Sequence, residues 1–423
     1  MTITKQPSCD DPFDALLPVE LARQQLLEAV ESVVETEQVE LSQATGRILA
    51  GNTVSPINVP SYTNSAMDGY AISATSIPAL GEAQLNIIGT AWAGRIFDGS
   101  VSKGEAVRVF TGALMPDGAD TVVIQEHVLT EGDCLTIDSK VVPYRNVRQA
   151  GEDVEQNSTV LTNGTQLRAA EIGVLASLGI ATVTVYRKLR VAYFTTGDEL
   201  RSLDTHAGQT LPPGMLFDSN RYTLQSMLQN LNVTVLDLGI VKDDAEETRK
   251  VMQRAADSAD LVVTSGGISA GDADFVTQVF HELGTVNFWK LAMRPGRPLA
   301  FGKIGNAFFF GLPGNPVAVM VTFLQFVQPA IRQLSGQAST LPYTVLAECQ
   351  STLRKSLGRV EFQRGILSND ADGKLIVNST GKQGAGRISS MSAANCLIVI
   401  DAEVAGVKPG DSVQVQPFSG LFG

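Results

Sequence analysis

The sequence is poor in the residues that build disulfide frameworks, zinc centres and basic binding surfaces. Its 423 residues include four cysteines, which form no C-x-x-C pair, and three histidines. These counts argue for a reducing compartment and against both a disulfide framework and a histidine-rich zinc site. Only 18% of residues are charged, and 32 Lys and Arg against 44 Asp and Glu give a net charge of −12. Because such a surface repels polyanions, we expect no nucleic-acid partner and no membrane.

The chain also lacks the pattern of a leader peptide or a membrane span. Acidic residues (Asp10, Asp11 and Asp14) stand where a signal peptide needs an apolar stretch. The most apolar region, 307–331, is broken by a Pro-Gly-Asn-Pro segment at 313–316, so we do not expect it to cross a bilayer. A hydrophobic content of 44% excludes intrinsic disorder. We therefore expect a soluble, cytoplasmic protein of roughly two to four domains.

Hydrophobic periodicity predicts several regions along the chain. Steps of three and four residues between apolar positions predict a helix over 19–33, and short β-type runs predict a β-rich region over 52–146. A second helical pattern covers 167–178, with Gly179 placed to end it. Strand-like and helical runs alternate over 190–336, which predicts a parallel, doubly wound sheet. After Leu341 the pattern predicts an all-β, barrel-like tail.

Four loops follow the predicted strands of the α/β region, at 195–200, 265–274, 290–298 and 311–316. Ligands of a doubly wound sheet bind beyond the carboxyl ends of its strands, so we expect the site there. In S-G-G-I-S-A-G-D-A-D, Gly266 and Gly267 let backbone N–H groups approach a phosphate at the start of the next helix. Asp272 and Asp274 then either complement the helix dipole or, together with the phosphate, hold Mg²⁺.

Three cations occur close together in one of these loops. Lys290, Arg294 and Arg297 fall within one segment of eight residues, in a chain whose net charge is negative. A solvated basic turn is the simplest interpretation of such a run. Because Pro295 and Pro298 stiffen the loop, we favour a fixed site for a tetrahedral oxyanion.

Other polar positions have two interpretations each. Asp198 and Glu199 follow a strand and are either functional acids or ordinary loop and capping residues. Asp68–Gly69, taken alone, is best interpreted as a hairpin turn, and Thr111–Gly112 as a plain strand exit. Residue chemistry alone therefore predicts an α/β anion-binding enzyme and goes no further.

Taken in order, the motifs resemble those of the molybdopterin molybdenumtransferase family, the bacterial MoeA type, and are similar to the gephyrin E domain. The similarity runs from about residue 18 to the C-terminus. The matching segments are S-A-M-D-G-Y (65–70), F-T-G-A (110–113), G-E-D-V (151–154), T-T-G-D-E-L (195–200), D-S-N-R (218–221), S-G-G-I-S-A-G-D-A-D (265–274), F-W-K-L-A-M-R-P-G-R-P (288–298), G-L-P-G-N-P (311–316) and G-R-V-E-F-Q-R-G (358–365).

The resemblance implies a multidomain protein of four parts. These are a linking helical/β domain (15–55 plus 147–187), a β-rich insert domain (56–146), a doubly wound α/β molybdopterin-binding domain (188–337) and a C-terminal β-barrel-like domain (340–423). It also implies an Mg²⁺-dependent enzyme that inserts molybdate into adenylylated molybdopterin, releasing AMP and forming molybdenum cofactor. The expected assembly is an elongated homodimer with its active sites between the subunits.

Carried over by motif, the resemblance implies catalytic roles for Asp68 of one subunit and for Glu199, Asp274, Lys290 and Arg294 of the other. Glu199 and Asp274 would bind Mg²⁺. Substrate-binding roles are implied for Thr111, Asp153, Asp243, Gly266, Gly267, Ser269, Arg297, Pro313, Pro316 and Arg364. Arg294 stands where the family often has lysine, so a planar fork replaces a point charge.

Two alternatives stay open. A molybdopterin adenylyltransferase shares the G-G-x-S loop and the α/β domain, but it lacks the S-A-M-D-G-Y half and the β tail. A non-catalytic scaffold of the gephyrin kind is the other alternative. For the enzyme, the expected partners are the adenylyltransferase that supplies the substrate and the molybdoenzymes that accept the cofactor.

Overall fold

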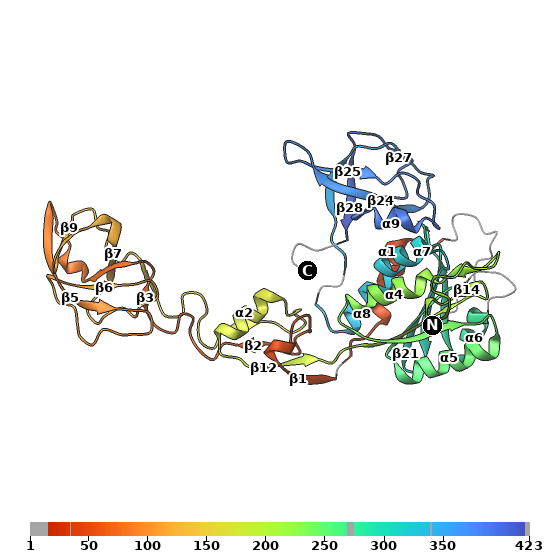
Figure 1. Cartoon of the computed structure of the whole chain (residues 1–423), viewed down its shortest axis with the longest axis horizontal. Helices are drawn as coiled ribbons and strands as arrows, with labels where there is room; N and C mark the ends of the chain where they lie inside the picture. Colours follow the sequence, from red (N-terminus) through yellow and green to blue (C-terminus); the bar gives the residue numbers. More distant parts are fainter. Residues whose placement is uncertain (1–15, 34, 269–274, 339–340, 419–423) are drawn as a thin grey trace.

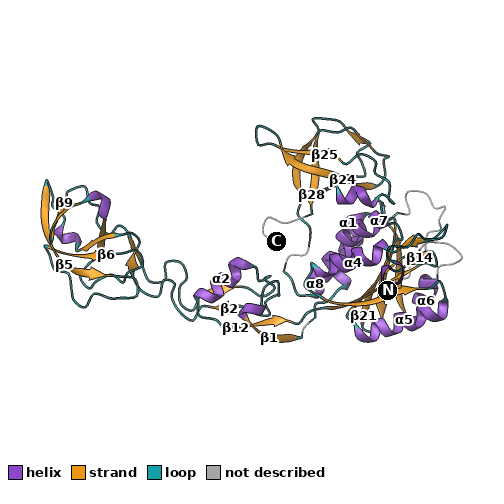
Figure 2. Cartoon of the chain, in the orientation of Figure 1, coloured by secondary structure: helices purple, strands orange, loops and turns teal. Residues whose placement is uncertain are grey.

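The computed structural model describes residues 16–33, 35–268, 275–338 and 341–418 of the chain. The molecule is elongated, with the β-rich domain at one end and the α/β domain at the other (Figure 1). A small middle domain containing α2 joins them, and the C-terminal β domain lies beside the α/β domain (Figure 2).

The α/β domain is built on a six-stranded sheet. Across the sheet the strands are β16 (Thr234–Val241), β13 (Arg190–Thr196), β17 (Leu261–Ser265), β21 (Ala307–Leu312), β20 (Pro298–Ile304) and β18 (Gly284–Lys290). The first four are parallel, which confirms the alternation expected from the sequence. β20 differs from the all-parallel expectation because it runs antiparallel to both neighbours. Gly305, in the left-handed region at φ 56°, and Asn306 form the tight turn that joins β20 to β21.

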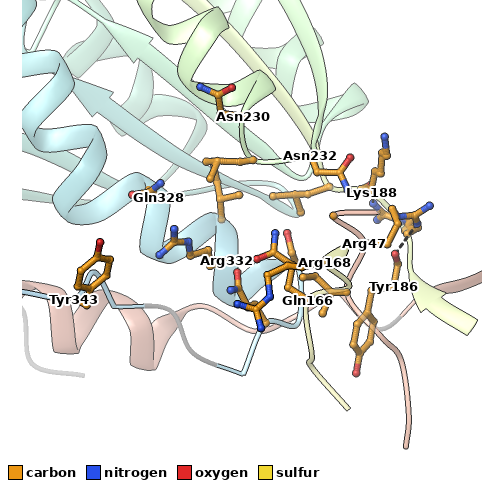
Figure 3. Close-up of a pocket in the computed structure, with 18 of the residues that line it drawn as sticks. Arg47, Gln166, Arg168, Tyr186, Lys188, Asn230, Asn232, Gln328, Arg332 and Tyr343 are labelled. Carbon is orange, nitrogen blue, oxygen red and sulfur yellow. Dashed lines mark hydrogen bonds between the residues drawn. The ribbon is translucent and has the colours of Figure 1, made fainter. Parts of the chain in front are cut away.

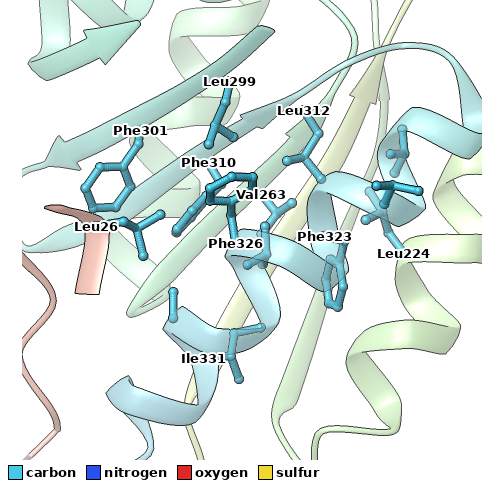
Figure 4. Packing of buried hydrophobic residues seen from close by; sticks show 14 of the residues in the cluster. Leu26, Leu224, Val263, Leu299, Phe301, Phe310, Leu312, Phe323, Phe326 and Ile331 are labelled. Carbon is cyan, nitrogen blue, oxygen red and sulfur yellow. The ribbon is translucent and has the colours of Figure 1, made fainter. Parts of the chain in front are cut away.

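Helices cover both faces of this sheet, as a doubly wound fold requires. One face carries α1 (Val19–Ala29), α4 (Ser219–Gln229), α7 (Pro316–Thr322) and α8 (Gln328–Leu334), and the other carries α5 (Ala245–Ser258) and α6 (Phe275–Leu283). Each face has its own buried apolar cluster. In the larger one, Leu26 of α1 and Phe326 pack against Phe301 and Phe310 of the sheet (Figure 4).

The first helix is shorter than its apolar periodicity predicts. α1 ends at Ala29, and Val30 is already extended at φ −98°, ψ 117°. The backbone N–H of Val33 instead donates to Leu334 O at 2.8 Å. Tertiary contact with the end of α8 therefore replaces the last predicted turn.

The most apolar segment of the chain forms a core helix. Pro316–Leu334 is, within the described ranges, the one helix long and apolar enough to cross a membrane, and 72% of its most apolar window is buried inside the domain. The Pro-Gly-Asn-Pro segment at 313–316 ends β21 and begins α7. As expected from the sequence, it divides the apolar region 307–331, and the two parts are a strand of the sheet and the core helix.

The middle domain is formed by two separate stretches of chain. β1 (Thr36–Glu40) pairs antiparallel with β12 (Thr182–Tyr186), and α2 (Ala169–Ser177) lies beside them. α2 ends close to the predicted position, at Gly179, which adopts φ 72° and donates to Ala176 O at 3.0 Å. Two short pairs form the ribbon that leads to the β-rich domain: β2 (Thr53–Val54) with β11 (Thr159–Leu161), and β3 (Asn64–Ser65) with β10 (Val147–Arg148).

The β-rich domain contains a second six-stranded sheet. Its strands, in order, are β7 (Thr121–Ile124), β4 (Gly69–Ile72), β6 (Glu105–Val109), β5 (Glu82–Ala91), β9 (Cys134–Asp138) and β8 (Leu129–Glu131). The hairpin interpretation of Asp68–Gly69 is wrong, because Gly69 is the first residue of a strand paired on both sides. A Cβ at Gly69 would lie 2.1 Å from Val123 O, so close strand approach explains the glycine.

The C-terminal domain is a closed β-barrel, which confirms the barrel-like tail expected from the sequence. Its strands are β22 (Val345–Cys349), β24 (Val360–Asn369), β25 (Leu375–Ser379), β26 (Cys396–Ile400) and β28 (Ser412–Pro417). β24 pairs with both β25 and β26, so the five strands form a ring. The short strand β19 (Met293–Arg294) pairs with β24 and ties the barrel to the α/β domain.

Candidate functional site

A cavity of about 600 Å³ lies beyond the carboxyl ends of β13, β17 and β21. The four loops singled out in the sequence all contribute to it, and Gln383 and Ala385 add a wall from the C-terminal domain. This is the edge where parallel strands direct their following loops, and where doubly wound folds bind ligands.

The glycine loop after β17 is shaped by close packing. Gly266 and Gly267 adopt φ 93° and 65°, a region that favours glycine. A Cβ on Gly266 would lie 2.7 Å from Thr196 O, and one on Gly267 would lie 2.5 Å from a methyl group of Val276. The Gly266 N–H is already used, since it donates to Leu312 O at 3.1 Å. The amide of Gly266 is therefore not available for an anion.

One asparagine, for which the sequence predicted no role, ties two of the cavity loops together. Asn220, in the first turn of α4, donates through Nδ2 to Ser265 Oγ at 2.9 Å and to Gly314 O at 2.7 Å. Ser265 Oγ in turn donates to Pro313 O at 3.1 Å. The D-S-N-R motif was the available signal, because its aspartate caps α4 and so fixes the position of Asn220.

An acidic group lies on one side of the cavity. The backbone N–H of Asp198 donates to Asp243 Oδ2 and the N–H of Asp243 donates to Asp198 Oδ1, both at 3.3 Å. The Glu199 carboxylate folds back over Gly197, where an added Cβ would lie 2.6 Å from Oε2. Burial raises the pKa of Asp243, and the charges of Asp198 and Glu199 raise it further.

These carboxylates provide a partial fit to a magnesium site. Carboxylate oxygens are the ligands Mg²⁺ prefers, and the ion typically keeps several waters and uses one or two protein carboxylates. No cluster of three or more ligand side chains with metal-binding geometry occurs within the described ranges. Asp274 and Ser269, together with Asp272, lie outside the described residues.

The predicted cations divide into two sets. Arg294 and Arg297 line the cavity. The Arg294 side chain is 63% exposed, with Nη1 3.5 Å from Glu361 Oε1. Lys290 ends β18 and is not one of the described residues that line the cavity.

Three polar atoms in the cavity wall are buried without a hydrogen-bond partner in the described part of the chain. They are Thr196 Oγ1, Asn220 Oδ1 and Arg297 Nε. Buried polar atoms are normally paired, so an unpaired set around one cavity is typical of a site that a ligand or water completes.

A second cavity, of about 640 Å³, opens between the first and the barrel and shares Arg294, Pro295 and Gln383 with it. Arg364 of β24 lines this cavity, and Nε donates to Ser390 Oγ at 3.0 Å. Burial, with the nearby charge of Arg294, lowers the pKa of Arg364 to about 10. Pro313 lines the first cavity, and Pro316 begins α7 directly after its rim.

Asp68 and Thr111 lie together, but at the far end of the molecule (Figure 1). Asp68 Oδ1 accepts hydrogen bonds from the backbone N–H and the hydroxyl of Thr111, both at 2.8 Å. These bonds lower the pKa of Asp68, and the charge of Arg108 adds to the effect. Asp153 lies in the ribbon to the middle domain, where its N–H donates to Val59 O at 3.0 Å. A single chain therefore does not bring these three residues to the cavity.

Comparison with known proteins finds relatives over nearly the whole chain. Family models match residues 17–179 (MoeA N-terminal region, domain I and II), 192–333 (probable molybdopterin binding domain) and 347–418 (MoeA C-terminal region, domain IV). The chain is 42% identical to the molybdopterin molybdenumtransferase of Haemophilus influenzae over 410 residues, which cover 96% of this chain and 100% of that protein. It is 34% identical to the one of Nostoc sp., covering 98% and 97%.

Solved structures agree with the sequence relatives. The molybdopterin biosynthesis moeA protein of Pyrococcus horikoshii superposes with a TM-score of 0.83 at 29% identity, covering 95% of this chain and 100% of that one. The domain order and the closed barrel are thus those of a known protein family. The chain belongs to the molybdopterin molybdenumtransferase (MoeA) family.

Proposed function

We propose that the chain is a molybdenum insertase, which transfers molybdate into adenylylated molybdopterin, releases AMP and forms molybdenum cofactor in an Mg²⁺-dependent reaction. The observation that carries the proposal is the composition of the 600 Å³ cavity: arginines on one side and carboxylates on the other, around unpaired buried polar atoms. Both substrates are anions, so they need cations to approach each other.

The cations are assigned to the oxyanion. Arg294 and Arg297 approach the cavity from the loop between β18 and β20, and Gly296 lets that loop pack closely, since a Cβ there would lie 2.3 Å from Thr322 Oγ1. A fixed guanidinium fork suits molybdate or a terminal phosphate, and positioning the two anions supplies much of the acceleration. Lys290 is assigned to the same clamp by the family resemblance alone.

The acidic side is assigned to the metal. The set expected from the resemblance is Glu199 with Asp274. Asp243 is added here as a neighbour of that set, because its pKa is raised by burial and by the charges of Asp198 and Glu199, and a divalent cation would favour its charged form. When bound there, Mg²⁺ would neutralise the phosphoanhydride of the substrate. Asp198 and Asp243 hold each other through reciprocal backbone hydrogen bonds, which orients both carboxylates before any ion binds.

A homodimer is proposed because the predicted site residues lie at opposite ends of one chain. Asp68 and Thr111 are held together in the β-rich domain, while Arg294 and Glu199 are in the α/β domain (Figure 1). A second copy whose β-rich domain reaches the first copy's cavity would bring Asp68 there. A monomer by sedimentation at micromolar concentration, with full activity, would rule this arrangement out.

Location and partners follow from the same proposal. A pathway enzyme whose chain is acidic and whose Cys134, Cys349 and Cys396 are unpaired suits the reducing cytoplasm. The expected protein partners are the adenylyltransferase that supplies the substrate and the molybdoenzymes that accept the cofactor, with neither nucleic acid nor membrane involved.

Cofactor formation in vitro tests the proposed function. The purified chain, adenylylated molybdopterin, molybdate and Mg²⁺ should yield AMP and a cofactor that activates an apo-molybdoenzyme, and omission of Mg²⁺ should prevent both. Glu199→Gln should lose the reaction, whereas Glu246→Gln, an exposed acid on α5 paired with Lys250, should keep it. Consumption of ATP and molybdopterin instead would identify an adenylyltransferase, and no turnover of either kind would favour a scaffold.

A further inference from the structure

A cavity of about 800 Å³, which we call the junction pocket, lies between the middle domain and the α/β domain. It is at the amino edge of the α/β sheet, where β13 and β16 begin, and so opposite the candidate active site. Arg47, Arg168 and Tyr186 line it from the middle domain, and Lys188, Asn232 and Arg332 line it from the other side (Figure 3).

The junction pocket is basic in an otherwise acidic protein. Five of its described lining residues are Lys or Arg, and no described lining residue is Asp or Glu. Arg47, Arg168 and Arg187 each pair with a carboxylate that lies outside the pocket. The backbone carbonyls of Lys188 and Arg332 accept hydrogen bonds, but the side chains of these two residues make no hydrogen bond or ion pair with the rest of the described chain. Within the described residues, these two positive charges therefore have no carboxylate partner.

Arg332 carries most of the argument. It lies in the last turn of α8, where a cation complements the helix dipole. That role does not require burial, because an exposed lysine would fill it equally well. The Arg332 guanidinium is partly buried instead, and this burial alone lowers its pKa. A desolvated charge without a partner is costly, and a bound anion would offset that cost.

We propose that the junction pocket binds a small phosphorylated molecule whose phosphate is held by Arg332 and Lys188. Guanidinium and ammonium groups are the usual phosphate-binding side chains, and the fork of Arg332 can donate two parallel hydrogen bonds. The side-chain amides of Gln166 and Asn232 provide donors and acceptors for the rest of the molecule. The volume is within the range of sites that hold ligands of nucleotide size.

Such a ligand would bridge the two domains. At this junction Asn232 lies against Gly46, whose added Cβ would be 3.1 Å from Nδ2, and the ring of Tyr186 lies against Gly336. The chain passes from one domain to the other at Arg187–Lys188, in the pocket wall. Ligand binding would therefore fix the angle of the arm that carries the β-rich domain. The proposal does not depend on the activity assigned to the other cavity.

Isothermal titration calorimetry with pyrophosphate tests the proposal on the full chain. We expect the wild-type protein to bind the probe, and Arg332→Gln to weaken one class of binding by at least about tenfold, since it removes charge-assisted hydrogen bonds. Arg332→Lys should recover part of the loss. The matched control is Lys250→Gln, an exposed lysine on α5 of the same domain, which should bind like the wild type.

Two further variants separate this pocket from the candidate active site. Arg294→Gln should leave the Arg332-dependent binding unchanged, and Lys188→Gln should weaken it. Melting temperatures of the unliganded proteins check folding, and Arg332→Gln should melt at the same or a higher temperature because an unpaired buried charge is removed. Absence of pyrophosphate binding, equal binding by wild type and Arg332→Gln, or loss of all binding in Arg294→Gln would each overturn the proposal.

Discussion

Replacing Asn220 by alanine should destabilise the α/β domain and loosen the candidate site together. The substitution removes two hydrogen bonds, to Ser265 Oγ at 2.9 Å and to Gly314 O at 2.7 Å. Each neutral hydrogen bond contributes about 1 kcal/mol net, so the free energy of unfolding should fall by about 2 kcal/mol. In a domain of this size that corresponds to a melting temperature lower by about 4–8 °C.

Calorimetry of thermal unfolding measures the first effect, and titration with adenylylated molybdopterin, the proposed substrate, measures the second. Gln229→Ala, at an exposed position at the end of the same helix, is the control and should change the melting temperature by less than about 1 °C. In a double-mutant cycle, Asn220→Ala and Ser265→Ala should be non-additive, since the two side chains share a bond. Additive effects, or an unchanged melting temperature in Asn220→Ala, would show that Asn220 does not tie the loops.

The remaining predictions concern single residues at the candidate site and in the β-rich domain. Gly266→Ala should lower the free energy of unfolding by at least about 2 kcal/mol and abolish ligand binding, because φ 93° is strained for alanine and its Cβ would lie 2.7 Å from Thr196 O. Chemical denaturation measures the loss, and a stable, active variant would refute the packing argument. Thr111→Val removes the hydroxyl donor but keeps the backbone N–H, which is the larger cause of the lowered pKa, so the pKa of Asp68 should rise part of the way towards the ordinary value of about 3.9. The lowered pKa stabilises the native state above the ordinary pKa, and this contribution is lost as pH falls through the folded value, so the variant should lose part of that acid-side dependence; an NMR titration that leaves the Asp68 pKa unchanged would contradict this. Arg294→Ala should raise the molybdate concentration needed for insertion about tenfold and Arg294→Lys less, while equal weakening of both substrates would assign the loop to phosphate.

Local patterns predicted the elements that are regular and separated by turns. The alternation over 190–336 predicted the parallel part of the α/β sheet that β16, β13 and β17 form, because its apolar runs are bounded by polar or glycine residues. It did not identify β20 and β21, because the two strands lie in one largely apolar stretch between the proline-containing loops at 295–298 and 313–316. The Gly305–Asn306 pair was the local signal of the hairpin between them.

The candidate site was predictable only where its functional residues belong to loops with a recognisable composition. Glycine and arginine loops at strand ends pointed to the cavity, since a parallel sheet gathers such loops at one edge. Asn220 and Gly69 were not predicted, because their roles arise from contacts with Ser265 and with Val123 O, far away in the sequence. Gly69 also follows an aspartate, and this pair imitates a hairpin turn.

Mixing two inactive variants tests the central claim most directly, namely that Asp68 of one subunit acts at the cavity of the other. Asp68→Asn and Glu199→Gln should each abolish cofactor formation as homodimers. After the two are mixed and allowed to exchange subunits, half of the dimers are hybrids with one intact site, so about a quarter of wild-type activity should return. If each site were built from one chain only, or if the protein worked as a monomer, the mixture would stay inactive, and that result would contradict the shared site.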